Sequence, residues 1–342
     1  MESGGGSTTA QGVVLSVLVP VYNEIDVLPE FHRRLTAVLG ACVPAYEVMY
    51  VNDGSTDGSL AWLEALCDRD PAVALVDLSR NFGKEIAMAA GLDHVRGDAV
   101  IVIDADLQDP PELIPRLLEQ WRAGYDNVYA RRRQRDGETW LKKASAAWFY
   151  KVIGKLSRVR IPQDTGDFRL LSRRAVEALR QLREQHRFMK GLFAWIGYPS
   201  IAVEYDRDPR HAGRTKFNYW KLWNFALEGI TSFTIAPLRL ATYFGILVAL
   251  AAFVAIVVLV AKTLLYGDPV KGYPSLMSVI LFLGGIQLIA LGALGEYIGR
   301  MFNETKGRPL YFTKAFIPSR HAMRSAQARR VDLEHGAGIG NG

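Results

Sequence analysis

Cysteine is scarce in this sequence: the 342 residues include two, Cys42 and Cys67. Two cysteines supply neither a disulfide framework nor the ligand spacing of a metal site, and they fit a reducing compartment. The N-terminal residues 1–12 lack the apolar core of a signal peptide and are rich in glycine, serine and threonine. We therefore expect a flexible leader there.

A large excess of either charge is also missing. Lys plus Arg number 41 against 35 for Asp plus Glu, a net charge of +6. An excess this small gives no indication of a nucleic-acid partner, and we expect none. The basic residues gather near the two longest apolar runs, which suits contact with an anionic membrane surface.

Long apolar runs are missing from the first two-thirds of the chain and occur only in the last third. Leu240–Ala261 and Leu276–Leu294 contain no charged residue, and each is long enough to span a bilayer. Two core helices of a soluble domain are the less favoured alternative, because buried soluble helices rarely run this long without charge. We predict two transmembrane helices, at about 238–265 and 276–298, in a membrane part that covers 237–301.

The charges that flank these runs predict the orientation. Arg239 precedes the first run, and Arg300, Lys306, Arg308 and Lys314 follow the second. The positive-inside rule then places both termini and the N-terminal domain in the cytoplasm, as in a multi-pass protein of the bacterial inner membrane. We expect amphipathic interfacial helices over 213–236, where aromatic residues lie beside lysines, and a basic, partly disordered tail over 302–342.

The first part of the chain alternates apolar runs with helical patterns. We predict strands at 13–19, 46–51, 73–78 and 100–103, and helices at 25–39, 59–67, 85–95 and from 112 onward. Such alternation is typical of a mostly parallel α/β sheet with right-handed crossovers. A polar cluster follows each strand, namely 20–24, 52–57, 79–85 and 104–109, so all four should gather along one edge of the sheet.

The fourth cluster carries the clearest chemistry. Asp104 and Asp106 follow a buried apolar strand and, two residues apart in extended chain, share a face; Gln108 comes next. Two carboxylates and an amide oxygen are hard ligands suited to Mg²⁺ or Mn²⁺, which commonly carry substrate phosphates. The plainer alternative is an acidic turn that caps the next helix, a role open to Asp109, just as Ser55 or Asp57 could cap the helix after the second strand.

Further along, 124–130 is predicted as another strand, 131–143 is strongly basic, and 164–171 reads as a polar turn that enters a strand before a helix at 173–182. The basic stretch suits recognition of a phosphate, and it could equally be a solvated loop that touches lipid headgroups.

Five motifs together resemble one family. VPVYNE at 19–24, VNDGSTDGS at 51–59, LSRNFGKE at 78–85, DADLQDPPELI at 104–114 and DTGDFRLLSRRAV at 164–176 resemble the family 2 glycosyltransferases. More narrowly they resemble the polyprenyl-phosphate sugar transferases, the bactoprenol glucosyl transferase and dolichyl-phosphate mannose synthase type. The resemblance covers roughly 14–311 and implies a GT-A (Rossmann-like) catalytic domain over 13–212.

The resemblance implies roles for individual residues. The nucleotide would be held by Pro20, Tyr22, Glu24, Asp53, Lys84, Asp104, Arg210 and Lys216. Of these, Arg210 and Lys216 lie with Arg207 on what resembles a loop that closes over the donor. Asp104, Asp106 and Gln108 would hold the divalent metal.

For catalysis the resemblance implies that Asp167 faces the reacting centre and that Arg169 supports it. The acceptor phosphate would be met by Arg132, Arg135, Lys142 and Ser145. Relatives usually carry serine where this chain has Ala146, so Ser145 is only a neighbouring candidate. A lipid phosphate is already an anionic nucleophile and needs positioning more than a base, so Asp167 could orient the acceptor or a cation instead.

The hypothesis is an inverting, membrane-anchored hexosyltransferase that transfers a sugar from a nucleotide sugar to polyprenyl phosphate, in the synthesis of a cell-envelope glycan. UDP-glucose with undecaprenyl phosphate is the favoured pair and GDP-mannose the alternative donor. A processive synthase is disfavoured because the chain has no Gln-x-x-Arg-Trp motif and too few spans for a channel. The alternative of a different class is a non-catalytic membrane scaffold. Asp104, Asp106 and Gln108 argue against it, because a scaffold has no need of a metal site. A homotetramer is suggested by the resemblance to two-span enzymes.

Overall fold

The computed structural model describes residues 15–133, 165–185, 187–205, 236–266 and 272–320. These residues divide into two compact units. One unit contains an α/β sheet domain, to which the segment 309–320 also belongs; the other contains two long helices.

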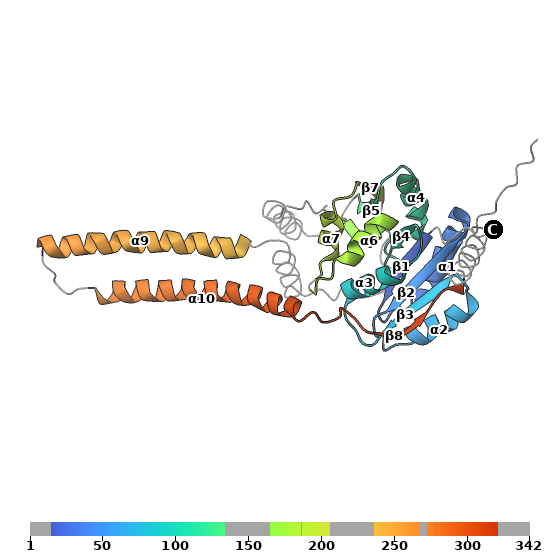
Figure 1. Cartoon of the computed structure of the whole chain (residues 1–342), viewed down its shortest axis with the longest axis horizontal. Coiled ribbons are helices and arrows are strands. Elements are labelled where there is room, and N and C mark those ends of the chain that lie inside the picture. The colour runs from blue at the N-terminus through green and yellow to red at the C-terminus, as the bar shows by residue number, and fades with distance from the viewer. Residues whose placement is uncertain (1–14, 134–164, 186, 206–235, 267–271, 321–342) are drawn as a thin grey trace, which may run out of the picture. The chain divides into compact units, whose positions relative to one another are not determined.

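The sheet domain is built on eight strands in the order β7-β5-β6-β4-β1-β2-β3-β8 (Figure 1). Their bounds are β1 (Leu15–Val21), β2 (Tyr46–Asn52), β3 (Val73–Leu78), β4 (Ala99–Val102), β5 (Asn127–Arg132), β6 (Thr165–Ser172), β7 (Ser200–Tyr205) and β8 (Thr313–Ile317). Strands β4, β1, β2 and β3 are parallel neighbours, so the predicted parallel core is confirmed. Strand β6 runs antiparallel to β4 and to β5, β7 pairs parallel with β5, and β8 runs antiparallel to β3.

Helices cover both faces of this sheet. They are α1 (Leu28–Cys42), α2 (Ser59–Arg69), α3 (Lys84–His94), the 3₁₀ turn η1 (Pro111–Leu113), α4 (Ile114–Arg122), α6 (Arg173–Gln181) and α7 (Met189–Trp195). Strand β1 supplies side chains to both layers, because successive residues point to opposite faces. Val17 belongs to the same buried cluster as Leu35 of α1. On the other face Leu18 lies so close to Gly91 of α3 that a Cβ there would come within 1.9 Å of it.

The predicted strands and helices of 13–122 are all present, with ends displaced by a few residues. The strand expected at 124–130 begins and ends later, as β5. Strands β7 and β8 and helix α7 were not predicted. Strand β8 lies in the stretch assigned by sequence to the basic tail, and all five of its residues are exposed. An edge strand with both faces in solvent carries no burial pattern, which is why the sequence does not reveal it.

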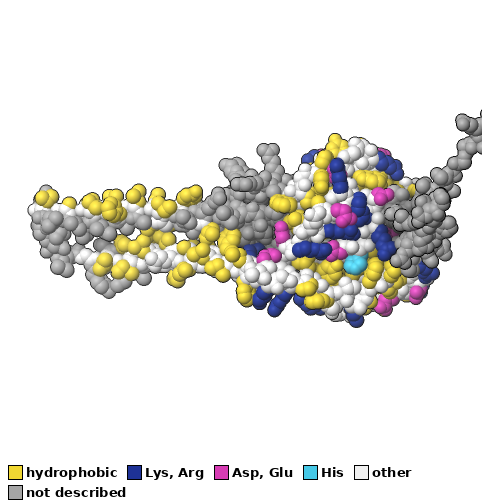
Figure 2. All heavy atoms as spheres, in the orientation of Figure 1, with side chains coloured by type: hydrophobic (Ala, Val, Ile, Leu, Met, Phe, Trp, Pro, Cys, Tyr) yellow, Lys and Arg dark blue, Asp and Glu magenta, His cyan; other side chains and the backbone are white. Residues whose placement is uncertain are grey.

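The second unit consists of α9 (Ala236–Tyr266) and α10 (Tyr273–Thr305), 31 and 33 residues long, which contact each other. Apolar side chains line the described surfaces of both helices (Figure 2). Within the described residues, one segment, Phe282–Thr305 in α10, is long and apolar enough to cross a membrane by length and composition. The helices occupy the predicted places, whereas a second membrane crossing stays a prediction.

Candidate active site

The carboxyl ends of the parallel strands surround a cavity of about 290 Å³. It is lined by Pro20, Val21, Tyr22, Glu24, Asp53, Asn81, Gly83, Lys84, Ala87, Asp104, Ala105 and Asp106. Six of the eight residues predicted to bind a nucleotide, and two of the three predicted metal ligands (Asp104 belongs to both sets), therefore line one cavity. The cavity lies where open α/β sheets bind their ligands, outside the strand ends.

Asp53, the first residue after β2, lines the cavity and joins two of its loops. Its carboxylate accepts hydrogen bonds from the backbone N–H groups of Phe82 and Gly83, at 2.7 and 2.9 Å. Burial raises the pKa of Asp53, against the opposing effect of these two bonds. The next residue, Gly54, has φ of +67°, and a Cβ there would lie 2.6 Å from the carbonyl carbon of Arg80. The loops after β2 and β3 are thus locked together by a geometry that requires glycine.

The loop after β1 is tied to the same place. The Asn23 side-chain oxygen accepts the backbone N–H of Thr56 at 2.8 Å, and Ser55 Oγ accepts the backbone N–H of Asn23 at 3.0 Å. Asp57 accepts the N–H of Ser59, the first residue of α2, at 2.9 Å. The polar cluster at 52–57 therefore does both things considered from sequence: Asp53 lines the cavity and Asp57 binds the start of a helix.

Lys84 connects the two carboxylates at the centre of the site. Its ammonium lies 2.7 Å from the carboxylate of Asp104 and 2.5 Å from Oδ2 of Asp167. Burial disfavours the charged lysine, but the two carboxylates outweigh it and raise the pKa of Lys84. Burial likewise acts to raise the pKa of Asp167, yet Lys84 and Lys190 hold it below its ordinary value. The other Asp167 oxygen, Oδ1, is buried and has no hydrogen-bond partner in the described part of the chain.

Arg169 lies beside the turn that carries Asp167, and its supporting role in catalysis stays a prediction. Its guanidinium is buried, donates to the carbonyl oxygen of Gly166 at 3.1 Å, and lies over the ring of Phe193, 3.7 Å from the centroid. Burial lowers the pKa of Arg169 to about 10. Arg169 also donates to the backbone carbonyl of Asp167 at 3.4 Å and to the Asn127 side-chain oxygen at 3.5 Å, so its contacts hold the backbone of this turn.

Two ionisable groups beside the site were not foreseen from the sequence. Glu85 accepts the backbone N–H of Met189 at 2.8 Å, joining α3 to α7 across 104 residues. Burial, with the Asp167 charge adding to it, raises the pKa of Glu85 to about 7. Burial lowers the pKa of Lys190, against the attraction of Asp167. Glu85 belongs to the motif at 78–85. Lys190 lies in α7, and no motif around it in the sequence indicates a place near the site.

Arg132, predicted to meet the acceptor phosphate, is half-buried and lies apart from the cavity lining. It donates to the hydroxyl of Tyr205 at 3.4 Å, and its Nη2 lies 4.0 Å from Asp109. Tyr205 in turn donates to the Asp109 carboxylate. The other predicted acceptor and loop residues lie outside the described residues, namely Arg135, Lys142, Ser145, Arg207, Arg210 and Lys216.

The donor set fits a divalent cation that also binds substrate phosphates. Asp104 and Asp106 line the cavity, and the buried Gln108 donates its backbone N–H to Asp106 Oδ1 at 3.1 Å. No three His, Cys, Asp or Glu side chains within the described ranges form a complete metal cage. Mg²⁺ is typically held by one or two carboxylates plus phosphates and water, so a partial protein set of oxygen ligands suits it. Oδ1 of Asp167, buried and without a hydrogen-bond partner among the described residues, is a further oxygen beside this donor set.

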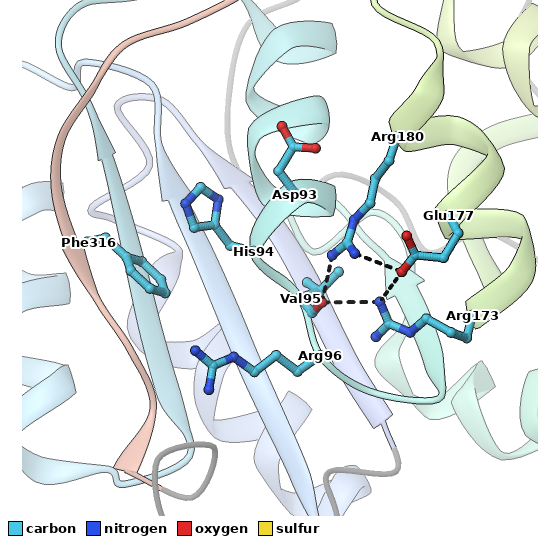
Figure 3. Close-up of a pocket in the computed structure, with 8 residues that line it drawn as sticks. All are labelled: Asp93, His94, Val95, Arg96, Arg173, Glu177, Arg180 and Phe316. Atoms are coloured by element: carbon cyan, nitrogen blue, oxygen red, sulfur yellow. Dashed lines mark hydrogen bonds and ion pairs between the residues drawn. The ribbon is translucent and has the colours of Figure 1, made fainter. Parts of the chain in front are cut away.

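A larger cavity, about 490 Å³, lies at the opposite end of α3 (Figure 3). Arg173 and Arg180 of α6 both donate to the carbonyl oxygen of Val95, at 3.2 and 2.9 Å, and both pair with Glu177. Their guanidinium groups thus bind the carbonyl end of α3, where cations stabilise a helix. This is a structural role, and the oxygen ligands and the lysine gather at the other end of α3.

Comparison with known proteins identifies the family of the chain. Residues 16–180 match the model of glycosyl transferase family 2, and residues 236–301 match the GtrB C-terminal hairpin. The chain belongs to glycosyl transferase family 2 and is a glycosyltransferase. It is 49% identical over 301 residues to the bactoprenol glucosyl transferase of Shigella phage SfX, covering 88% of this chain and 99% of that protein.

Two further proteins match the chain. An uncharacterised glycosyltransferase of Synechocystis sp. is 54% identical over 299 residues, which is 87% of this chain and 94% of that protein. Among solved structures, glucosyl-3-phosphoglycerate synthase from Mycobacterium tuberculosis matches with a TM-score of 0.44 and 20% identity, over 64% of this chain and 78% of that one. A likeness this distant bears on neither substrate nor metal.

Proposed function

We propose that the protein transfers glucose from UDP-glucose to undecaprenyl phosphate, with inversion at the anomeric carbon. The observation that carries the proposal is the cavity at the sheet edge, in which Asp53, Lys84, Asp104 and Asp106 converge with Tyr22. A base and ribose need fixed polar groups, and a diphosphate needs cationic charge; the cavity offers both. The name of the relative that shares 49% identity supports the acceptor and the sugar.

In the proposed reaction an oxygen of the lipid phosphate attacks the anomeric carbon while the bond from that carbon to the diphosphate oxygen breaks. The electron pair of that bond leaves with the nucleoside diphosphate. The lipid phosphate is an anion at neutral pH, so no proton has to be removed. Asp167 is held ionised beside Lys84, which suits it to orient a cation or the acceptor.

Charge on the leaving diphosphate is what the site must stabilise. Lys84 supplies one positive charge at the cavity wall. A divalent metal, Mg²⁺ or Mn²⁺, held by Asp104, Asp106 and Gln108, would supply Lewis acidity to the leaving diphosphate. Donors aimed at developing charge contribute on the order of 3 kcal/mol each to transition-state stabilisation.

The acceptor is a membrane lipid, so the proposal includes a membrane anchor. Helices α9 and α10 are each longer than the roughly 20 residues that a span requires. We propose that both cross the inner membrane with the catalytic domain in the cytoplasm, as a homotetramer. Arg132, Arg135 and Lys142 would meet the lipid phosphate, and a loop with Arg210 and Lys216 would close over the donor.

The test is a donor panel with full-length protein in detergent, undecaprenyl phosphate, and Mg²⁺ or Mn²⁺. UDP-glucose, UDP-galactose, UDP-GlcNAc and GDP-mannose are supplied in turn, and the glycolipid is detected by mass spectrometry. A glucosyl product from UDP-glucose alone supports the proposal; a product from GDP-mannose alone replaces the donor. No lipid-linked product from any donor would contradict it.

Asp106→Asn tests the site. We expect turnover to fall by at least about 100-fold, while folding and membrane insertion persist. Asp98→Asn is the matched control, since Asp98 is an exposed aspartate just before the other end of β4. Product formation that survives Asp106→Asn would remove Asp106 from the metal site.

A further inference from the structure

Lys84 lies between two carboxylates and pairs with one of the proposed metal ligands, Asp104, as well as with Asp167. Its ammonium is within 2.7 Å of both Asp104 and Asp167, and these two side chains are otherwise 28% and 11% exposed. Lys84 itself is 41% exposed, at the first residue of α3 and on the cavity wall. A long side chain with this exposure can change its rotamer without rearranging the sheet.

The charges around Lys84 constrain which ion can bind there. Lys84 holds the carboxyl groups of both Asp104 and Asp167 by hydrogen bonds, so its single positive charge is shared between them. A divalent cation at Asp104 must either share that carboxylate with the ammonium or displace it. Sharing places like charges within a few ångströms in a partly desolvated site, where repulsion is strong.

A nucleoside diphosphate removes this conflict. Its oxygens offer Lys84 a new anionic partner, so the lysine can leave Asp104 and Asp167 without losing its counter-charge. Asp104 would then be free to hold a metal, while Lys84 would pair with the diphosphate.

We infer that Lys84 is the resting counter-ion of the donor site, and that it makes binding of a divalent metal conditional on the donor diphosphate. This inference rests on the proposed function, because it takes Asp104 as a metal ligand and a nucleotide sugar as donor. It adds an order to the reaction: the metal enters with the donor and is held weakly without it. Because coupling is reciprocal, the metal tightens the diphosphate by the same factor.

The experiment measures Mn²⁺ binding to the full-length protein in detergent by electron paramagnetic resonance, with and without UDP, corrected for Mn²⁺ held by UDP in solution. The variants are Lys84→Met, which removes the charge, and Lys84→Arg, which keeps it. Lys190→Met is the matched control: it removes a second positive charge that acts on Asp167 but is not bonded to Asp104.

We expect UDP to tighten Mn²⁺ binding to the unmodified protein by at least about tenfold, within the usual range of coupling between two sites. Lys84→Met should bind Mn²⁺ alone at least about tenfold more tightly than the unmodified protein, the factor that corresponds to one pKa unit of charge interaction. In the same variant the tightening by UDP should shrink. Lys84→Arg and Lys190→Met should stay close to the unmodified protein in the absence of UDP.

The inference is overturned if Lys84→Met binds Mn²⁺ alone no more tightly than the unmodified protein. It is overturned as well if Lys190→Met has an equal effect, since a general field and not occupancy of the site would then be responsible. Glycolipid formation by the unmodified protein is assayed in parallel and tests the proposed function separately. Product without any UDP-dependent binding of Mn²⁺ would leave the proposed function standing and refute the role of Lys84.

Discussion

Replacing Glu85 with glutamine should change how stability depends on pH. Glu85 lies in the first turn of α3 and accepts the backbone N–H of Met189, the first residue of α7, at 2.8 Å. Burial, with Asp167 adding to it, raises its pKa from 4.5 to about 7. Glutamine keeps an oxygen that can accept the same hydrogen bond, but it cannot titrate.

The sign follows from where the proton is held. Between pH 4.5 and about 7 the folded protein keeps the proton on Glu85 and the unfolded chain releases it, so the free energy of unfolding falls as the pH rises through this window. A shift of this size corresponds to about 3 kcal/mol. The variant lacks this loss, so its stability relative to the unmodified protein should increase by up to about 3 kcal/mol from low pH to pH 8.

The assay is thermal unfolding of the two proteins in detergent at several values between pH 5 and pH 8. For a domain of this size the full effect amounts to a relative rise in Tm of roughly 6–10 °C for Glu85→Gln. Glu30→Gln is the matched control, because Glu30 is an exposed carboxylate paired with Arg33. If the difference in Tm between Glu85→Gln and the unmodified protein is the same at pH 5 and pH 8, the reasoning about Glu85 is refuted.

Three further substitutions test the packing around the site. Gly54→Ala forces a Cβ to within 2.6 Å of the Arg80 backbone at φ +67°, so we expect a loss of at least about 1 kcal/mol in unfolding free energy and weaker UDP binding by calorimetry. Tyr205→Phe removes the hydroxyl that donates to the buried Asp109 and should cost about 1–3 kcal/mol in denaturant unfolding. Phe31→Ala, at a fully buried position of α1, should cost about 3–5 kcal/mol with m unchanged. Unchanged midpoints in any of the three would contradict the packing described.

The parallel half of the sheet could be predicted because each of its strands is buried on both faces. Such strands read as continuous apolar runs, and Val100 to Val102 in β4 are fully buried. The polar residues that follow these runs must lie at one edge whatever the details of packing. That is why the polar clusters that contain Asp53, Lys84 and Asp104 could be placed along one edge from the sequence, and all three side chains line one cavity in the structure.

The antiparallel part was harder, because its strands are specified by partners far away in the chain. Strand β8 is an exposed edge that is held by pairing with β3 and by anchors on either side of it. Tyr311 donates to Asp93 at 2.8 Å, and Arg320 donates to the carbonyl of Asp68 at the end of α2. These bonds span more than 200 residues, and no periodicity within the strand reports them.

The roles of charged side chains also divide into those that a local motif predicts and those that depend on residues far away in the chain. A motif predicts that Lys84 and Asp104 lie near a substrate. It does not predict that Lys84 bridges Asp104 and Asp167, because Asp167 lies on an antiparallel strand far away in the chain. The residue types alone indicate a metal site of two acids and an amide. The structure adds that a cation, the lysine of the chain itself, already bridges two carboxylates there. The inferred exchange of this lysine for a metal would make the order of donor and metal binding a measurable property of the chain, which the Mn²⁺ titrations with and without UDP test directly.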